Sequence, residues 1–268
     1  MPNVEWVLPQ DESEIHIRKP DVVLYKNAFS QEMCERIDGF NEVPVRAVTG
    51  WTSTDFRTDA PPAGPVKDFR RFQHVKGMSD QKQTSLVLGA WLANPDFPKL
   101  TIIATMHDGF RIPVTLKASE NVEIIFRKIP MGELRTYQEA CGVHVYPSNL
   151  EGFGHSLNEA RVCESVLVTT DGHPMSGFVT HRETGFLVPV EQSDIQTVRR
   201  SRGYEIRQSA LEHTIRHVLS HSPSELARIG RRSRQAYLTD RDAFNTRIAD
   251  VFGKRGRVPI ARGAIKAA

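Results

Sequence analysis

Short apolar runs and longer amphipathic segments alternate through most of the chain after residue 66. The short runs are rich in Val, Ile and Leu, which is typical of buried strands, and the segments between them carry apolar residues at helical spacing. We expect strands at residues 72–75, 100–106, 122–126, 142–146 and 166–170. The expected helices cover residues 82–94, 131–140, 155–163, 206–220 and 224–237. Strands separated by helices favour an α/β fold with a Rossmann-like, doubly wound parallel sheet.

The first 60 residues follow a shorter version of this pattern. Phe29, Met33, Ile37 and Phe40 fall on one face of an expected helix, and Ser30 is in a suitable place to be its N-cap. The expected helix covers residues 28–40, and the strands cover 3–9, 21–25 and 45–49. Residues 1–60 therefore read as a partial α/β N-terminal segment.

A linker signal separates the two regions. The sequence DAPPAGP at residues 59–65 holds three prolines and one glycine, which favour an irregular, extended chain. We place the linker at residues 61–66, the Rossmann-like domain at 67–250, and a tail at 251–268.

Charge is distributed unevenly along the chain. The net charge is +3, but the residues from 254 onward carry five basic side chains and no acidic ones, so the rest of the chain sums to −2. Such a tail is expected to be disordered and solvated, with contact to nucleic acid or an anionic membrane as the weaker alternative. The remainder of the chain has no nucleic-acid-binding module, so no nucleic acid partner is expected.

Composition places the chain among globular proteins, since 39% of residues are hydrophobic and 25% are charged. No apolar run is long enough for a membrane span, and no signal peptide pattern opens the chain. Cys34, Cys141 and Cys163 are far apart and lie in apolar or helical contexts, so we expect them to be reduced and buried. These features favour a cytoplasmic protein, or one peripheral to a membrane.

The most informative stretch follows the expected strand at residues 142–146. There the loop Glu151-Gly152-Phe153-Gly154 leads into the expected helix at 155–163 and then into the strand at 166–170. This order predicts a βαβ unit whose glycine loop lies at the carboxyl end of a strand, where α/β sheets bind ligands. The free N–H groups at the start of the helix would favour an anion there.

Several elements of this stretch occur together in a known order. The pattern P-S-x-x-E-G-F-G-x-x-x-x-E-A is followed by an apolar strand, T-D, a Pro and E-T-G-F-L-V-P. It resembles the donor-binding domain of retaining GT-B glycosyltransferases, the large family 4 or "glycosyl transferases group 1" type. Glu151 and Glu159 match the two ends of that family's Glu-x7-Glu motif. One departure is Cys163-Glu164-Ser165-Val166, where the family usually has a C-G-x-P turn.

The N-terminal segment carries a second part of the resemblance. Glu5-Trp6, Leu24-Tyr25-Lys26 and residues 49–53 (TGWTS) fit the last part of the family's acceptor-side domain. The resemblance therefore implies a GT-B enzyme whose N-terminal domain is truncated.

The resemblance also implies a site for the donor diphosphate. The family has a loop of the form G-[RK]-x-x-x-x-K-G after the first strand of this domain. The matching segment runs from Lys76 to residue 84 and includes Ser79, and Lys82 fits its second basic position. Gly77 or Met78 stands at the first basic position, where adjacent Lys76 could substitute. The alternative is that Lys82 only begins a surface helix.

By the same resemblance, Glu159 accepts hydrogen bonds from the donor ribose, and Glu151 lies near the transferred sugar. Lys82 and Glu151 are thus the expected catalytic residues. The alternative is that Glu151 and Glu159 are merely solvated side chains. Gly152 belongs to the same loop, and the backbone N–H groups of three further residues would face the sugar or phosphate: Phe153, Gly154 and His155. The loop at 127–130, with Lys128 and Ile129, matches the segment that pairs with the nucleobase.

No metal site is expected. The histidines near the loop in sequence form no H-x-x-x-H or H-x-E pair, and no D-x-D motif occurs. These histidines are His107, His144, His155, His173 and His181. There is also no G-x-S-x-G elbow for a serine nucleophile. The resemblance agrees with metal-independent chemistry, and no cofactor is expected besides the nucleotide-sugar substrate.

The function that follows is transfer of a sugar, with retention, from a UDP- or GDP-linked donor to an unknown glycan, lipid or protein acceptor. In the family the leaving phosphate is thought to assist deprotonation of the acceptor. A second chain or a homo-oligomer would complete the N-terminal domain. The alternatives are an inactive or split-enzyme subunit that binds a nucleotide sugar, and an unrelated nucleotide-binding Rossmann enzyme.

Overall fold

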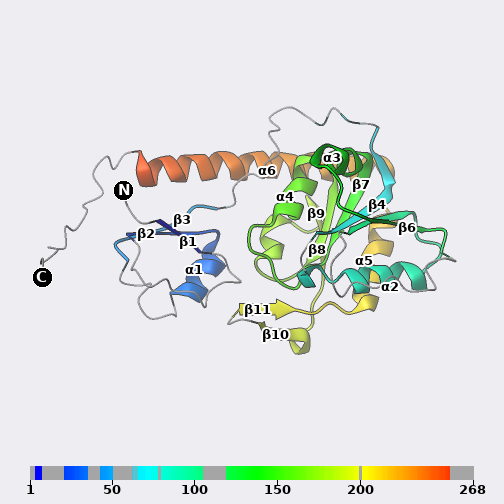
Figure 1. Ribbon diagram of the computed structural model, residues 1–268, viewed down its shortest axis with the longest axis horizontal. Helices are drawn as coiled ribbons and strands as arrows, with labels where there is room; N and C mark the ends of the chain where they lie inside the picture. Colours follow the sequence, from blue (N-terminus) through cyan, green and yellow to red (C-terminus); the bar gives the residue numbers. More distant parts are fainter. Residues whose placement is uncertain are drawn as a thin grey trace, which may run out of the picture.

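The computed structural model describes residues 4–7, 21–35, 43–50, 62, 64, 66–77, 80–104, 119–198 and 201–253. These residues form a six-stranded sheet flanked by helices, a three-stranded N-terminal sheet, and a small hairpin (Figure 1). The predicted Ser79 and His107, and most of the predicted linker and tail, lie outside the described residues.

The six-stranded sheet is entirely parallel, as predicted, and has the strand order β6-β5-β4-β7-β8-β9. Its strands are β4 (Asp68–Gly77), β5 (Leu100–Ala104), β6 (Val122–Phe126), β7 (Cys141–Tyr146), β8 (Val166–Thr170) and β9 (Gly185–Val188). The order reverses between β4 and β7, which are adjacent in space although β5 and β6 separate them in sequence. The loops after these two strands therefore border the topological switch point, where doubly wound sheets bind ligands.

Helices cover both faces of this sheet. They are α2 (Thr84–Ala93), α3 (Met131–Ala140), α4 (His155–Val162), α5 (Gln208–Leu219) and α6 (Pro223–Phe252). Helices α2 and α5 pack together on one face, while α3 and α4 lie against β7 and β8 on the other. None of the helices in the described part of the chain is long and apolar enough to cross a membrane.

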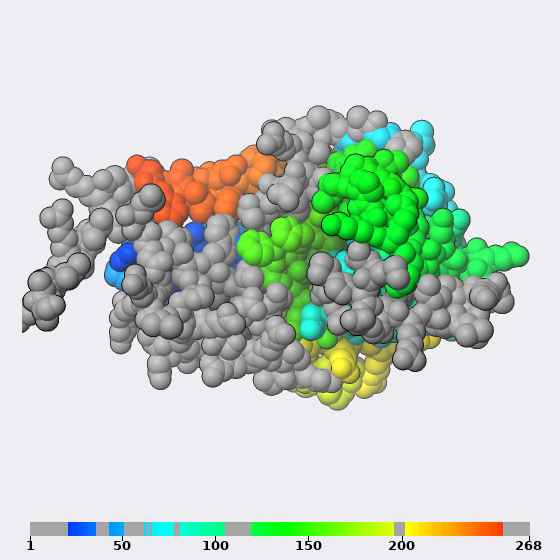
Figure 2. All heavy atoms as spheres, in the orientation of Figure 1, coloured from blue at the N-terminus to red at the C-terminus, as the bar shows by residue number. Residues whose placement is uncertain are grey.

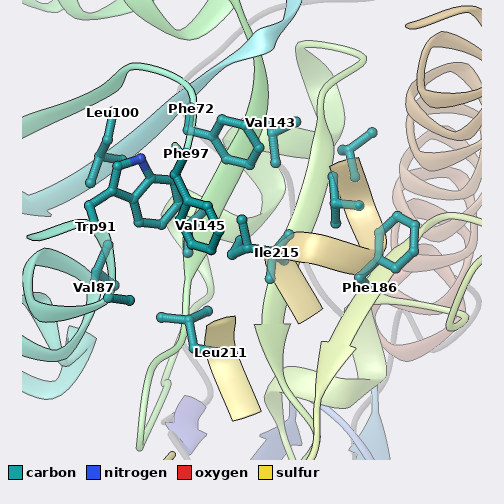
Figure 3. Packing of buried hydrophobic residues seen from close by; sticks show 14 of the residues in the cluster. Phe72, Val87, Trp91, Phe97, Leu100, Val143, Val145, Phe186, Leu211 and Ile215 are labelled. Atoms are coloured by element: carbon teal, nitrogen blue, oxygen red, sulfur yellow. The ribbon is translucent and has the colours of Figure 1, made fainter. Parts of the chain in front are cut away.

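The larger hydrophobic core lies between the sheet and helices α2 and α5 (Figure 3). Trp91 is fully buried between Phe72 and Phe97, with both ring pairs edge to face at 5.3 Å. Its indole N–H donates to the Pro98 carbonyl at 2.7 Å, so the ring leaves no unmet donor. This packing fixes the sheet on which the loops of the switch point are mounted.

The N-terminal sheet is also parallel and has the order β1-β2-β3. Its elements are β1 (Val4–Val7), β2 (Val22–Tyr25), α1 (Ala28–Cys34) and β3 (Val45–Val48). The prediction of Ser30 as N-cap was wrong, because Asn27 caps α1 and its Oδ1 accepts from the Ser30 backbone N–H at 2.7 Å. The predicted helical positions Ile37 and Phe40 lie outside the described residues.

Helix α6 is much longer than the predicted helix at 224–237. It begins with a capping box between Ser222 and Glu225, with Pro223 at its first position, and it continues to Phe252. The helical spacing of apolar residues becomes irregular after Tyr237, because no later side chain of α6 is buried. No helix breaker follows until Gly253, so the helix continues. Helix α6 therefore passes the predicted boundary at residue 250, and Arg247 donates to the Thr49 carbonyl at 3.2 Å. Orange-red atoms of α6 lie beside blue N-terminal atoms in Figure 2.

Three strands were not predicted. Strand β9 forms the edge of the sheet, and strands β10 (Ile195–Val198) and β11 (Ser201–Tyr204) pair as an antiparallel hairpin. Strand β4 also begins before the predicted residue 72, because its polar first half is held by tertiary contacts. For example, Arg70 donates to the carbonyls of Leu219 and His221 at 3.0 and 2.9 Å.

Candidate functional site at the carboxyl ends of β4 and β7

The predicted βαβ unit is present as β7, the glycine loop, α4 and β8. Gly154 is the N-cap of α4 and adopts φ 66°, the left-handed region that favours glycine. A Cβ at this position would lie 2.3 Å from Cζ of Phe178, so space also requires glycine here. The turn brings the start of α4 to the switch point between β4 and β7.

Lys82 lies in the loop after β4, at the end of the 3₁₀ turn Asp80–Lys82. Its Nζ donates to Ser156 Oγ on α4 at 2.7 Å and lies 5.2 Å from the centre of the Tyr146 ring. The prediction that the helix begins at Lys82 was wrong, because Gln83 adopts a left-handed conformation and α2 begins at Thr84. Lys82 is therefore not a surface residue at a helix start, since its ammonium group points to the other loop of the switch point.

Glu151 stabilises its own loop. Its Oε1 accepts from the Gly154 backbone N–H at 3.1 Å, and its Oε2 lies 3.5 Å from Ser148 Oγ, which donates to it. The carboxylate thus lies at the N-terminal end of α4, where the helix dipole favours negative charge.

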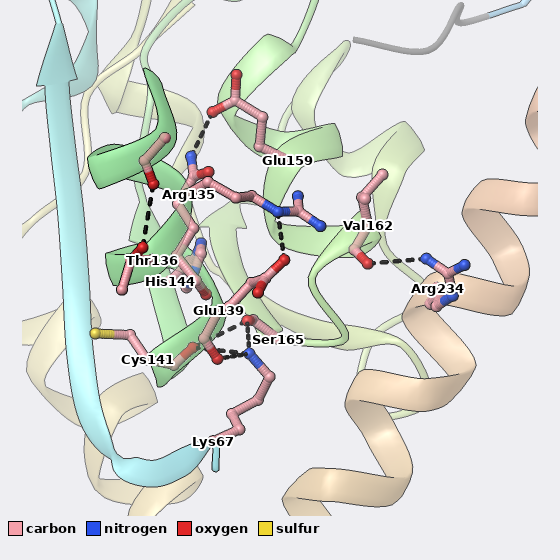
Figure 4. Close-up of polar contacts among 12 residues, drawn as sticks. Lys67, Arg135, Thr136, Glu139, Cys141, His144, Glu159, Val162, Ser165 and Arg234 are labelled. Carbon is pink, nitrogen blue, oxygen red and sulfur yellow. Dashed lines mark hydrogen bonds and ion pairs between the residues drawn. The ribbon is translucent and has the colours of Figure 1, made fainter. Parts of the chain in front are cut away.

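Glu159 lies one turn further along α4 and is partly buried. Its Oε2 accepts from Gln138 Nε2 on α3 at 2.7 Å, and this bond is the dashed line that leaves Glu159 in Figure 4. Burial raises the pKa of the Glu159 carboxyl, while the charge of Lys82 and the Gln138 hydrogen bond act in the opposite direction.

The charges of Lys82, Glu151 and Glu159 act on one another at this point. Burial lowers the pKa of the Lys82 ammonium, and the two carboxylates oppose that effect. The structure thus brings together the cation and both ends of the Glu-x7-Glu motif, at the edge of the sheet where the sequence predicted them.

The two loops of the site are fastened to each other by Gln83. Its Nε2 donates to the carbonyls of Pro147 and Tyr204 at 2.7 and 3.1 Å, and its Oε1 accepts from the Ile206 N–H at 3.1 Å. One amide therefore joins the loop after β4, the loop after β7 and the end of β11. Sequence reasoning did not identify Gln83, because its partners lie 64 to 123 positions away.

Phe153 and His155 form a second small group in the glycine loop. Their rings stack with centroids 5.3 Å apart, and His155 is exposed. Lys26 Nζ from the N-terminal segment also lies over the Phe153 ring, 3.5 Å from its centroid. Lys26 follows β2 and is fully buried, which lowers its pKa to about 6. The N-terminal segment therefore contacts the glycine loop through the lysine of its L-x-K pattern.

The remaining predicted residues lie along the same edge of the sheet. Lys76 is buried near the end of β4, and Gly152 is buried in the glycine loop. Lys128 is exposed in the loop after β6, whereas Ile129 packs against a second hydrophobic cluster, which includes Tyr146 and Leu157. Since all six strands are parallel, the loop after β6 is at the same end of the sheet as Lys82.

Besides Gln83, the structure adds two further residues that the sequence did not indicate. Ser156 receives the Lys82 hydrogen bond, and Gln138 donates to Glu159. Nothing in the sequence identifies either one, because each contact joins separate elements. Within the described ranges, no group of three or more His, Cys, Asp or Glu side chains could hold a metal ion.

Two other predictions can be compared with the structure. Cys34, Cys141 and Cys163 are confirmed as buried and free of disulfide bonds. The turn that departs from the C-G-x-P pattern has a left-handed residue, Glu164 at φ 59°, in the position of the family's glycine.

A comparison with known protein families matches the part of the chain that contains the Glu-x7-Glu motif. Residues 115–203, which contain the glycine loop, α4 and β9, match the family described as "Glycosyl transferases group 1". No curated protein sequence matches the chain.

Solved structures extend the likeness to most of the chain. Anabaena HepE in complex with UDP has a TM-score of 0.67 at 16% identity, covering 94% of this chain and 72% of that one. The pneumococcal O-GlcNAc transferase GtfA in complex with UDP and GlcNAc has a TM-score of 0.63 at 13% identity, covering 87% of this chain and 45% of that one. Sucrose-phosphate synthase from Thermosynechococcus elongatus has a TM-score of 0.62 at 16% identity, covering 88% and 58%.

This chain therefore spans less than half the length of the pneumococcal transferase. At these identities the likeness defines the fold, which is that of the GT-B glycosyltransferases, as the motif predicted.

Proposed function

We propose that this chain, with its match to the group 1 glycosyltransferases, binds a nucleotide-diphospho-sugar at the carboxyl ends of β4 and β7. It transfers the sugar to an acceptor with retention of anomeric configuration, without a metal ion. The observation that carries this proposal is the arrangement of Lys82, Glu151 and Glu159 around the first turn of α4.

The diphosphate is assigned to Lys82 and the first turn of α4. Cleavage of the glycosidic bond leaves added negative charge on the phosphate, which needs a cation and N–H donors. Lys82 offers the cation, and the start of an α-helix offers unpaired N–H groups and the positive end of the dipole. A bound diphosphate would also offset the burial that lowers the pKa of Lys82.

Glu159 is assigned to the ribose, because a carboxylate can accept two hydroxyl hydrogen bonds. Glu151, with the backbone N–H groups of Phe153 and His155, is assigned to the transferred sugar, whereas the Gly154 N–H donates to Glu151 itself. Lys128 and Ile129 are assigned to the base. No protein side chain acts as nucleophile, and the leaving phosphate takes part in deprotonating the acceptor on the same face of the sugar.

UDP is the proposed nucleotide. Anabaena HepE was solved with UDP-glucose, and GtfA with UDP and GlcNAc. The acceptor is a glycan, lipid or protein, held on the side of the N-terminal segment that carries Lys26.

A second candidate is a subunit that binds the nucleotide sugar without turnover. It is favoured by the first basic position of the phosphate loop, where Gly77 or Met78 stands in place of the expected cation. One similar structure is a GtfA/B complex, so a partner chain that contributes to the acceptor side is part of this alternative.

Calorimetric titration with UDP, GDP and ADP tests the donor site. We expect one nucleotide to bind, and we expect Lys82→Ala and Glu159→Ala to abolish or strongly weaken that binding. Lys99→Ala is the matched control, because Lys99 precedes β5 at the opposite end of the sheet and pairs with Glu123. If no nucleotide binds, or if Lys99→Ala weakens binding as much as Lys82→Ala, the donor site is refuted.

Turnover assays separate the two candidates. Incubation with UDP-sugars and mixed acceptors, alone and with candidate partner chains, should release UDP if the chain is a transferase. Binding without release under all these conditions would favour the subunit.

A further inference from the structure

Gln138 is the residue of α3 that is fully buried, and its side chain is directed at the proposed ribose-binding carboxylate. Its Nε2 donates to Glu159 Oε2 at 2.7 Å, which joins α3 to α4. We propose that Gln138 is a positioning residue that holds the Glu159 carboxylate in the orientation that accepts the ribose hydroxyls. This inference rests on the proposed function.

The backbone of Gln138 is itself held in place. His144 on β7 is buried, and its Nε2–H donates to the Gln138 carbonyl at 3.0 Å. Burial lowers the pKa of His144 to about 3, so the ring is neutral and the hydrogen bond is that of an uncharged donor. The hydrogen bonds therefore run from the central sheet through Gln138 to Glu159.

A buried glutamine at position 138 lowers the stability of the fold compared with an apolar residue. Its Oε1 is buried and has no hydrogen-bond partner among the residues that the structure describes. An apolar side chain of similar size would avoid that cost, since burial of an unpaired polar atom is unfavourable. The hydrogen bond to Glu159 is thus the contribution that an apolar residue could not make.

The hydrogen bond from Gln138 acts together with nearby charged groups on the pKa of Glu159. Lys82 comes from the 3₁₀ turn, His155 from α4 and Arg135 from α3, and all three favour the ionised carboxylate. Tyr146 approaches from β7, and the negative charge of Glu159 helps to raise the pKa of its phenol. Because burial favours the protonated form of Glu159, loss of the Gln138 donor should raise the pKa of this carboxyl further.

The test uses Gln138→Met, which keeps the length of the side chain, and Gln138→Glu, which keeps its shape. Each variant is titrated calorimetrically with UDP, GDP and ADP across the acid range. We expect nucleotide affinity near pH 7 to fall about tenfold, the value of one hydrogen bond to a charged group. The pH at which binding is half lost should move upward, because Glu159 becomes protonated more readily.

Two controls make the test specific. Thr136→Ala changes an exposed side chain on the same helix and should leave both the affinity and the pH profile unchanged. In a Glu159→Gln background, Gln138→Met should cause no further loss. Carbon-13 NMR of the free protein, labelled at glutamate, reports the pKa of Glu159 independently of any nucleotide.

The outcomes separate the two proposals. If the wild-type chain binds no nucleotide, the proposed function fails and this inference fails with it. If wild type binds while both Gln138 variants keep its affinity and pH profile, only the inference fails. A full effect of Gln138→Met in the Glu159→Gln background would also overturn it, because Gln138 would then act by another route.

Discussion

The ammonium group of Lys26 lies 3.5 Å from the centre of the Phe153 ring, which places a residue of the N-terminal segment on the glycine loop. The negative face of an aromatic ring attracts a cation, although burial opposes the charged form of this lysine. The contact links the two parts of the chain at the loop that carries the Glu-x7-Glu motif.

Replacing Lys26 with Ala should loosen the glycine loop. Lys26 is fully buried against the Phe153 ring, and its pKa is lowered to about 6, so its removal chiefly takes away packing at the loop. A loss of about 1 kcal/mol, typical of a point variant, should make amide exchange at Gly152 and Phe153 roughly fivefold faster. Hydrogen exchange with mass spectrometry measures this rate. Lys99→Ala serves as the control, and equal protection of the loop in both variants would show that Lys26 does not restrain it.

Gly154→Ala should destabilise the protein because it adds both backbone strain and a clash. The residue has φ 66°, and the new Cβ would lie 2.3 Å from the Phe178 ring. We expect the free energy of unfolding to fall by roughly 2–4 kcal/mol in urea titrations. Gly132→Ala on α3 is the matched control, since nothing lies within 4 Å of its Cβ position. It should be neutral or slightly stabilising.

Stability should fall as the pH drops below about 6.5, the ordinary pKa of histidine. His74 and His144 are buried, which lowers the pKa of each to about 3. The unfolded chain therefore binds two protons that the folded chain does not bind between pH 6.5 and pH 3. From pH 7 to pH 5 these two residues should reduce the free energy of unfolding by on the order of 4 kcal/mol.

Urea titrations at the two pH values measure this loss. His74→Gln should remove about half of it, because one of the two protons is then no longer taken up on unfolding. The exposed His213 provides the comparison, and His213→Gln should leave the pH dependence unchanged.

Asp240→Ala should destabilise the attachment of α4 to α6. The Arg161 side chain is 2% exposed and forms an ion pair with Asp240. Without its partner, a buried guanidinium is left unpaired, and we expect a loss of roughly 3 kcal/mol by chemical denaturation. The double variant Arg161→Met, Asp240→Ala should recover part of that loss. No recovery would mean that Arg161 stabilises the helix pair mainly through its other contacts.

Elements whose bounds depend on short-range sequence patterns were predicted correctly. Strand β6, helix α3 and strand β8 have the predicted bounds, and Gly154 and Glu159 lie where the motif suggested. Each of these features depends on short-range periodicity or on a continuous motif.

The predictions failed where distant residues decide the outcome. Asn27 rather than Ser30 caps α1, and Gln83 takes a left-handed conformation beside loops that follow other strands. The partnership of Gln138 with Glu159 spans 21 positions and two helices, so no sequence window contains it as a pattern. The second half of α6 was missed because its exposed face carries little apolar periodicity.

The length of α6 has a consequence for the synthesis of the chain. The hydrogen bond from Arg247 to Thr49 joins residues 198 positions apart. While the ribosome is still adding α6, strand β3 is already outside the exit tunnel but the Thr49 carbonyl that follows it lacks this contact. Domains generally fold as units in the order of their synthesis. Thr49, which directly follows β3, therefore acquires its contact with α6 only after nearly all of the described chain has emerged.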